Sequence, residues 1–217
     1  FQNPGLLPNE HSNSLLANGN GGVDPAGMPV LHQESKPQTP EKQLQTERDT
    51  FSAAAQNIKD KLIEIPSLSL LRDQIEFTVT SEGLRIELVE KNGSSFFSLG
   101  KSQLRGESVE ILGIIAQEIG KLSNDLAVEG HTDRAAYRIG ATYGNMDLSS
   151  DRANAARRVM ETSGLRPGQV RSVSGFADTQ LRVANDPLDP RNRRVSILVK
   201  SQGVAAPDAG PPRDPGK

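Results

Sequence analysis

The chain has 217 residues, a formal net charge of −2 at pH 7 and no cysteine, and only 4% of its residues are aromatic. A charge so close to neutral offers no surface for a polyanion, which argues against nucleic acid as a partner. The lack of cysteine excludes disulfides, thiolate metal sites and cysteine nucleophiles. Because aromatic residues are scarce, the core must be built mainly from Leu, Ile, Val and Ala, which suits a single α/β domain.

Both ends of the chain have the composition of unfolded segments. Residues 1–46 contain breakers such as Pro4-Gly5 and Asn18–Gly22 and few apolar residues, so they are predicted to form a disordered linker. Residues 202–217, which include Pro211-Pro212, are predicted to be a disordered tail. The chain starts at Phe1 with neither a signal peptide nor a run of roughly 18 apolar residues, so we expect a fragment or a processed form.

The segment from residue 47 to 73 carries a helical pattern. Its apolar residues recur at spacings of three and four and stop before Pro66, which predicts an amphipathic helix that leads into the domain. A stripe of this kind packs on its own domain or pairs with its copy in a dimer. The stripe consists of Phe51, Ala54, Ala55, Ile58, Leu62 and Ile65.

Residues 74–201 are predicted to form one domain. Alternating apolar residues mark its strands, and spacings of three and four mark its helices, the second of which has Ser149 as a plausible N-cap. The order β-β-α-β-α-β predicts an α+β fold, a two-layer α/β sandwich with helices on one face of a mixed sheet. The expected strands are 75–80, 84–90, 126–129, 170–174 and 195–199, and the expected helices are 104–122 and 149–162.

The sequence contains no constellation that predicts an enzyme. His11 and His32 lie in the predicted linker, so neither a histidine metal cluster nor a Ser-His-Asp triad can be assembled around His131. His131 beside Asp133 could act as a base, but no serine nucleophile elbow accompanies it, and a hydrogen-bonded turn histidine is the simpler interpretation. The Gly-rich stretch at 19–22 also lies in the linker, which argues against nucleotide binding. We therefore expect no enzyme activity, no cofactor and no metal.

Two charged residues indicate a ligand-binding site instead. Asp133 follows a predicted strand, where its carboxylate can receive an amine, although an Asx-turn is the simpler explanation. Arg152 falls in the first turn of the helix predicted from Ser149, where a cation opposes the helix dipole. Either Asp151 or Asp133 compensates this charge, or Arg152 and the N–H groups of that turn grip a ligand carboxylate. One acid and one arginine at neighbouring ends of the fold suit a zwitterion such as an amino acid.

Residues distributed over about 74–200 resemble the signature of OmpA-like peptidoglycan-binding domains. Within that superfamily the chain resembles the periplasmic region of flagellar stator proteins of the MotB type, through Glu82–Leu88, Phe97–Gly100 and the extended loop Tyr137–Met146. The OmpA-like signature consists of Val128–Asp133, Asn145, Leu148-Ser149, Arg152–Asn154, Gly175 and Asn192–Val195.

The resemblance implies a non-catalytic peptidoglycan-binding site. In it, Asp133 and Arg152 would hold the amino and carboxylate groups of diaminopimelate in the stem peptide, which agrees with the zwitterion expected from the residues alone. The loop at 134–147 is longer by a few residues than in shorter members of the family, so the resemblance does not define what the added residues contribute to the site. The remaining residues that would line the site are Thr132, Asn145, Leu148 and Arg193.

The resemblance also implies partners and a location. The domain would anchor a stator complex to the cell wall, which allows torque generation and gated ion flow. It would form a homodimer with a MotA-type channel partner, and the flagellar P-ring is a further candidate partner. A single membrane helix would precede Phe1, so the chain would be the periplasmic portion of a single-pass inner-membrane protein. A structural wall anchor of the Pal or OmpA type without a motor role is the alternative, and a peptidoglycan hydrolase or amidase would need a metal or nucleophile that the sequence lacks.

Overall fold

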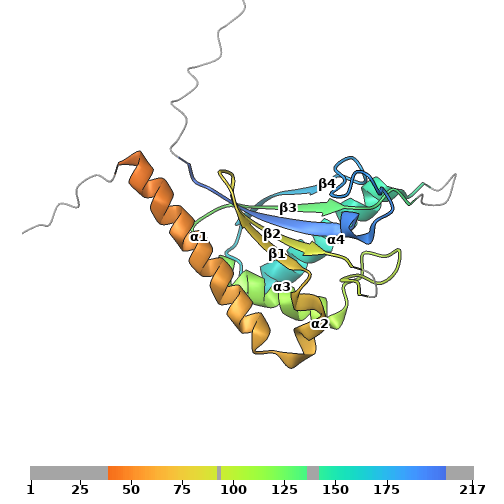
Figure 1. The fold of residues 1–217 in the computed structure, drawn as a ribbon, viewed down its shortest axis with the longest axis horizontal. Helices are drawn as coiled ribbons and strands as arrows, with labels where there is room; N and C mark the ends of the chain where they lie inside the picture. Colours follow the sequence, from red (N-terminus) through yellow and green to blue (C-terminus); the bar gives the residue numbers. More distant parts are fainter. Residues whose placement is uncertain (1–38, 92–93, 136–141, 204–217) are drawn as a thin grey trace, which may run out of the picture. The chain divides into compact units, whose positions relative to one another are not determined.

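The structure is a computed structural model, and it describes residues 39–91, 94–135 and 142–203 (Figure 1). Its helices and strands are α1 (Pro40–Ile63), the 3₁₀ turn η1 (Pro66–Leu68), α2 (Ser69–Arg72), β1 (Ile75–Val79), β2 (Gly83–Val89), α3 (Gly106–Ile119), β3 (Leu126–His131), α4 (Asn145–Thr162), β4 (Val170–Gly175), the 3₁₀ turn η2 (Pro190–Asn192) and β5 (Arg194–Lys200).

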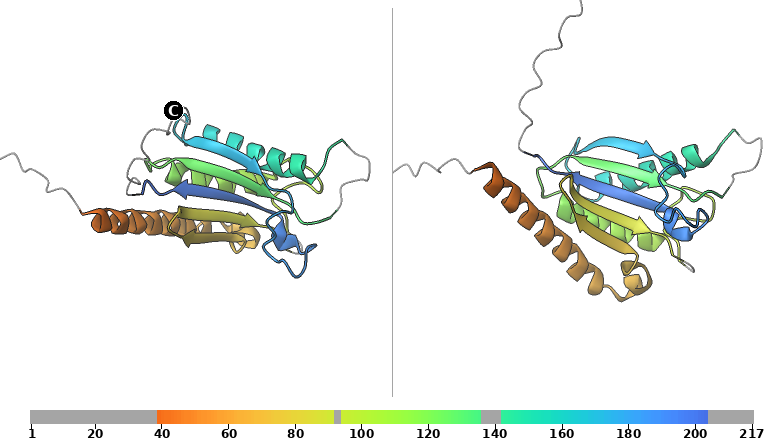
Figure 2. Two further views of the ribbon diagram at one scale, coloured as in Figure 1. Left: turned by 90° about the horizontal axis from the view of Figure 1, so that it is seen from above. Right: turned by 45° about the horizontal axis from the view of Figure 1, so that its top comes forward.

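The five strands form one mixed sheet in the order β1-β2-β5-β3-β4. Three neighbouring pairs are antiparallel, namely β1 with β2, β2 with β5 and β5 with β3. The fourth pair, β3 with β4, is parallel. Figure 2 shows α3 and α4 side by side on one face of this sheet. The predicted two-layer α/β sandwich is confirmed, but the predicted order β-β-α-β-α-β lacks one strand. Both β4 and β5 follow α4, so the order from β1 onward is β-β-α-β-α-β-β.

The core lies between the sheet and its helices. In β2, Leu84, Ile86 and Leu88 are buried, as the alternating pattern predicts, while Arg85 and Glu87 lie between them on the polar face. Each fully buried Leu or Ile contributes about 1.5–3 kcal/mol relative to an exposed one. The alternation therefore determines which face of the sheet the helices cover.

The first helix begins earlier than predicted. α1 starts at Pro40, so the predicted linker boundary at residue 46 is wrong. Proline is compatible with this start because the first helical residue needs no N–H donor and the ring presets a helical φ angle. The predicted apolar stripe is confirmed as buried from Phe51 to Leu62, and it packs on this chain's own domain. The rest of the predicted linker, residues 1–38, and most of the predicted tail, residues 204–217, lie outside the described residues.

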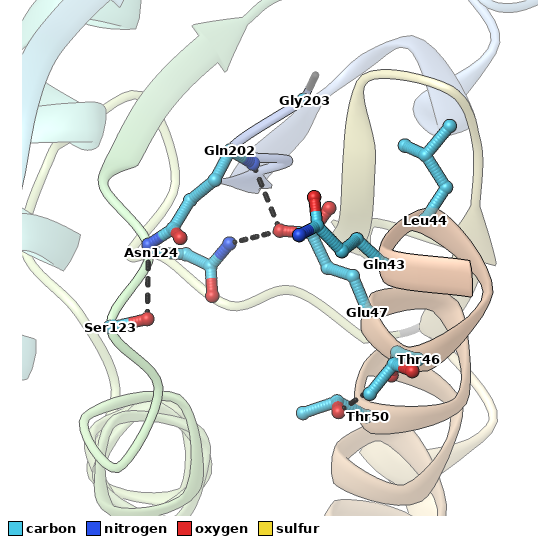
Figure 3. Close-up of a pocket in the computed structure, with 9 residues that line it drawn as sticks. All are labelled: Gln43, Leu44, Thr46, Glu47, Thr50, Ser123, Asn124, Gln202 and Gly203. Carbon is cyan, nitrogen blue, oxygen red and sulfur yellow. Dashed lines mark hydrogen bonds between the residues drawn. The ribbon is translucent and has the colours of Figure 1, made fainter. Parts of the chain in front are cut away.

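The N-terminal half of α1 is joined to the sheet through Glu47 (Figure 3). Its Oε1 accepts hydrogen bonds from Asn124 Nδ2 at 2.7 Å and from the backbone N–H of Gln202 at 2.9 Å. Burial alone would raise the pKa of Glu47, but hydrogen bonds from Gln202, Ser201 and Asn124 outweigh burial and lower the pKa. The charged carboxylate thus connects the helix to the start of β3 and the end of β5.

Candidate functional site

A cavity of about 610 Å³ lies beyond the C-terminal end of β3. Its wall is formed by residues after β2 and β3, by the loop before α3, by the first turns of α4 and by the residue before β5. The structure brings all of the predicted site residues to this one wall. They are Thr132, Asp133, Asn145, Leu148, Arg152 and Arg193.

Asp133 is buried at the cavity and is already hydrogen-bonded within the protein. Its Oδ1 accepts a hydrogen bond from the backbone N–H of Ala135 at 3.1 Å, so Asp133 forms the Asx-turn that was the simpler interpretation of its sequence. Its Oδ2 accepts Nη1 of Arg193 at 2.6 Å. A carboxylate offers about four acceptor positions, so these contacts leave capacity for a further donor.

Arg193 is held by a second carboxylate that the sequence did not single out. Its Nε donates to Oε2 of Glu90 at 2.6 Å, and the Glu90 side chain is only 4% exposed. Burial alone would lower the pKa of Arg193, but the hydrogen bonds and charges of Glu90 and Asp133 outweigh it and raise the pKa. Glu90, Arg193 and Asp133 therefore form one chain of charge-assisted hydrogen bonds. No local signal marks Glu90, because it directly follows β2 and its partner is distant in sequence.

Arg152 lies at the cavity, but it is not in the first turn of α4, as the sequence predicted. α4 begins at Asn145, where Gly144 is the N-cap and donates its N–H to the Asp147 carboxylate at 2.8 Å. Arg152 is therefore about two turns into the helix, outside the reach of the N-terminal dipole.

The side chain of Arg152 is positioned by the loop before α3. Its guanidinium carbon lies 4.9 Å from the centroid of the Phe97 ring, and its Nε donates to the Lys101 carbonyl at 3.1 Å. Arg152 is only 5% exposed. A cation–π contact and a hydrogen bond together fix the plane of the guanidinium against the cavity wall.

The three uncharged site residues have different roles. Asn145 donates from Nδ2 to the carbonyls of Asp133 at 3.3 Å and Ala135 at 3.0 Å, which holds the turn after β3. Leu148 supplies a buried apolar surface. Thr132 is 2% exposed, and its hydroxyl makes no hydrogen bond to any residue that the structure describes.

Ser149 is not the N-cap of α4. Its Oγ donates to the Met146 carbonyl at 2.9 Å and accepts the N–H of Ala177 at 3.1 Å, so it links the helix to the segment after β4. Two glycines allow this close approach. A Cβ on Gly130 would lie 2.0 Å from the Ser149 carbonyl oxygen, and one on Gly175 would lie 2.2 Å from Ser150 Oγ. The absence of these side chains allows the start of α4 to lie against β3 and β4, where it forms part of the cavity.

His131 is neither a base beside Asp133 nor a hydrogen-bonded turn residue. It ends β3, is 1% exposed and stacks on Phe176 with 5.3 Å between ring centroids. Neither of its ring nitrogens has a hydrogen-bond partner within the described ranges. Burial, reinforced by the positive charges of Arg194 and Arg85, lowers the pKa of His131 to about 3. The ring is therefore neutral near pH 7 and packs under the polar face of the sheet.

Among residues 39–91, 94–135 and 142–203, no group of three or more histidine, aspartate or glutamate side chains is placed to hold a metal ion. Within the same ranges, no helix has both the length and the apolar character needed to cross a membrane. Residues 136–141 of the 134–147 loop lie outside the described residues.

Residues 96–194 match the model of the OmpA family. Motility protein B of Escherichia coli is 37% identical over 142 residues, which are 64% of this chain and 46% of that protein. The Escherichia coli protein LafU, named for flagellar export or assembly, is 30% identical over 208 residues, which are 90% of this chain and 67% of that protein. The crystal structure of the periplasmic domain of Helicobacter pylori MotB shares the fold, with a TM-score of 0.51, 22% identity and coverage of 59% of this chain and 89% of that one.

These comparisons agree with the geometry of the cavity. The family match includes every residue of the cavity wall from Phe97 to Arg193, and the relative LafU extends the similarity over most of the chain. The chain spans less than half the length of Motility protein B. Through residues 96–194 the chain belongs to the OmpA family, and it is related in sequence to Motility protein B and LafU of Escherichia coli.

Proposed function

We propose that this chain binds peptidoglycan non-covalently through the cavity beyond β3 and thereby anchors a flagellar stator complex to the cell wall. Relationship to MotB proteins and the OmpA-like fold support a wall-anchoring role. The observation that carries the proposal is the meeting of Asp133 and Arg152, charges of opposite sign, on the wall of one cavity of about 610 Å³.

The cavity suits the zwitterionic end of diaminopimelate. Its amino group would donate to the Asp133 carboxylate, which keeps acceptor capacity beside its contacts to Ala135 and Arg193. Its carboxylate would meet the guanidinium of Arg152, whose planar fork matches a carboxylate. The apolar surfaces of Phe97 and Leu148 would contact the aliphatic chain between the two charged ends.

Binding without bond cleavage fits an anchor. The wall residues supply acceptors, donors and apolar surface, and the described part of the cavity wall holds no histidine and no metal-ligand cluster. An anchored stator would transmit force to the wall, which is the condition for torque and for regulated ion flow. In the whole protein, we propose a homodimer in the periplasm, a MotA-type channel partner and an inner-membrane attachment. A P-ring contact remains a further candidate.

A wall anchor of the Pal or OmpA type without a motor role is the alternative. The OmpA family match covers the peptidoglycan-binding part of the chain, which both kinds of anchor share. The protein segment that precedes Phe1 distinguishes them, because a membrane helix that carries one acid supports the stator, whereas a lipidated cysteine or a β-barrel supports the alternative.

Sedimentation with purified peptidoglycan tests the site. Asp133→Asn removes the negative charge, and Arg152→Lys removes the planar guanidinium, while both keep a side chain of similar size. Each should reduce the bound fraction at least about ten-fold. Arg158→Ala is the matched control, because this exposed arginine lies on α4 away from the cavity. Circular dichroism should show that all variants are folded. Wild-type binding by both folded site variants would rule out the assignment.

A further inference from the structure

The charges on the cavity wall are unequal in number. Three arginines, Arg105, Arg152 and Arg193, face two acids, Glu90 and Asp133. Both acids are paired with Arg193 in the hydrogen-bonded chain already described. A zwitterionic ligand adds no net charge, so it would leave one positive charge in excess on this wall.

Arg105 carries that excess at the edge of the cavity. It is exposed, and its guanidinium makes no hydrogen bond or ion pair with any other residue in the described ranges. Its backbone is nevertheless fixed, since its N–H donates to the Phe96 carbonyl at 3.1 Å and its carbonyl accepts the N–H of Val109 at 3.1 Å. The side chain is thus attached to a rigid position and remains available to a ligand.

The start of α3 does not explain an arginine at this position. Arg105 is the N-cap of α3, and its side chain makes no capping hydrogen bond. N-caps favour Ser, Thr, Asp or Asn, and a cation there opposes the helix dipole. The residue therefore costs the helix a small amount of stability that another contact of the guanidinium would offset.

The surface around Arg105 extends the site. A smaller cavity of about 140 Å³ adjoins the first one, and Ser95 and Arg105 line both. The wall of the smaller cavity also includes Leu70, Leu71 and Glu107, an acid that forms no ion pair with Arg105 in the described ranges. On the side of the larger cavity, the buried hydroxyl of Thr132 is a polar group without a partner among the described residues. A ligand longer than one amino acid can run from Asp133 and Arg152 past Arg105.

We propose that Arg105 is a specificity-determining residue that pairs with a second carboxylate of the ligand, beyond the amino and carboxylate groups held by Asp133 and Arg152. This inference rests on the proposed peptidoglycan function. A stem peptide offers this chemistry in two places, at the free α-carboxylate of its γ-linked D-glutamate and at the carboxylate of its terminal D-alanine. Either one would neutralise the excess positive charge, and amidation of either one would remove the contact.

Calorimetric titration with three synthetic stem peptides distinguishes the two sources. The parent tetrapeptide contains L-alanine, γ-linked D-glutamate, meso-diaminopimelate and D-alanine, and each derivative has one of the two carboxylates amidated. Arg105→Ala should weaken binding of the parent about three- to five-fold at low salt, the range of an exposed ion pair. It should have no effect on the derivative that lacks the paired carboxylate. That derivative identifies the carboxylate.

Two further variants make the result specific. Arg158→Ala removes an equal charge from an exposed position on α4 and should bind all three peptides like the wild type, whereas Arg105→Lys should keep part of the preference. Equal loss for all three peptides in Arg105→Ala, or no loss for the parent, would overturn the assignment while the proposed function stands. Failure of the wild type to bind the parent would instead overturn the proposed function, and the role of Arg105 with it.

Discussion

The Nη1 of Arg193 donates to Oδ2 of Asp133 over 2.6 Å, although 60 positions separate the two residues in the chain. The same guanidinium reaches Glu90 through its Nε. The orientation of the carboxylate that is proposed to receive the ligand amine therefore depends on a buried acid that directly follows β2.

Glu90→Gln should weaken both the fold and the site. The amide keeps the shape but removes the charge that faces Arg193, so the unfolding free energy should fall by about 1–2 kcal/mol, and Arg193 should shift its interaction toward Asp133. Urea denaturation and peptidoglycan sedimentation measure the two effects. Glu110→Gln, at an exposed position of α3 that lines neither cavity, is the control. Unchanged stability and binding in Glu90→Gln would show that Glu90 does not position Arg193.

His131 should make the fold sensitive to acid. Its folded pKa of about 3 lies below the ordinary value of 6.5, so the unfolded chain binds the proton more readily between these values. The stabilisation is fully present above about pH 6.5 and is lost as pH falls toward 3, by roughly 1.4 kcal/mol per pH unit. His131→Phe keeps a ring against Phe176 and cannot titrate. Its unfolding free energy should fall less steeply than that of the wild type between pH 6.5 and 4.5, and parallel curves would contradict the prediction.

Gly130→Ala should disturb α4 and the cavity together. The new Cβ would lie 2.0 Å from the Ser149 carbonyl oxygen, so the helix must move away from β3. We expect a loss of about 2–4 kcal/mol in thermal or urea unfolding, as for other overpacked backbone contacts. Gly113→Ala in α3 is the control, because its Cβ would have no neighbour closer than 3.7 Å, and alanine there favours the helix by up to about 1 kcal/mol. Equal stabilities of the two variants would contradict the close approach.

Ala177→Gly should stabilise the protein. Ala177 has a φ angle of +49°, in the left-handed region that glycine adopts at lower cost. Its N–H and carbonyl are bonded to Ser149 and Thr132, so the conformation is held by the site. The relief of strain exceeds the added flexibility of the unfolded chain by roughly 0.5–1 kcal/mol. A lower melting temperature for the variant would show that the residue is not strained.

Local patterns in the sequence were sufficient for most elements. The alternation of Leu84, Ile86 and Leu88 identified a strand and its buried face, and the helical stripe from Phe51 identified the buried face of α1. Both rest on periodicities of the backbone itself, two for strands and about 3.6 for helices, so no knowledge of distant residues is needed. The start of α4 was mispredicted because Ser149 is a good N-cap residue. The pair Gly144 and Asp147, an acid three residues after an N-cap, was the available signal.

The sequence by itself determined the α/β fold class and the apolar faces, and its family resemblance indicated the six residues that meet at the cavity. Only the tertiary structure decided how those residues are held. Glu90 reaches Arg193 across 103 positions, and Arg152 reaches the Lys101 carbonyl across 51. Arg105 becomes part of the site only because the loop before α3 lies beside β3 and α4. Such contacts carry no short-range pattern, because their energy depends on distances that exist only once the sheet and helices have packed.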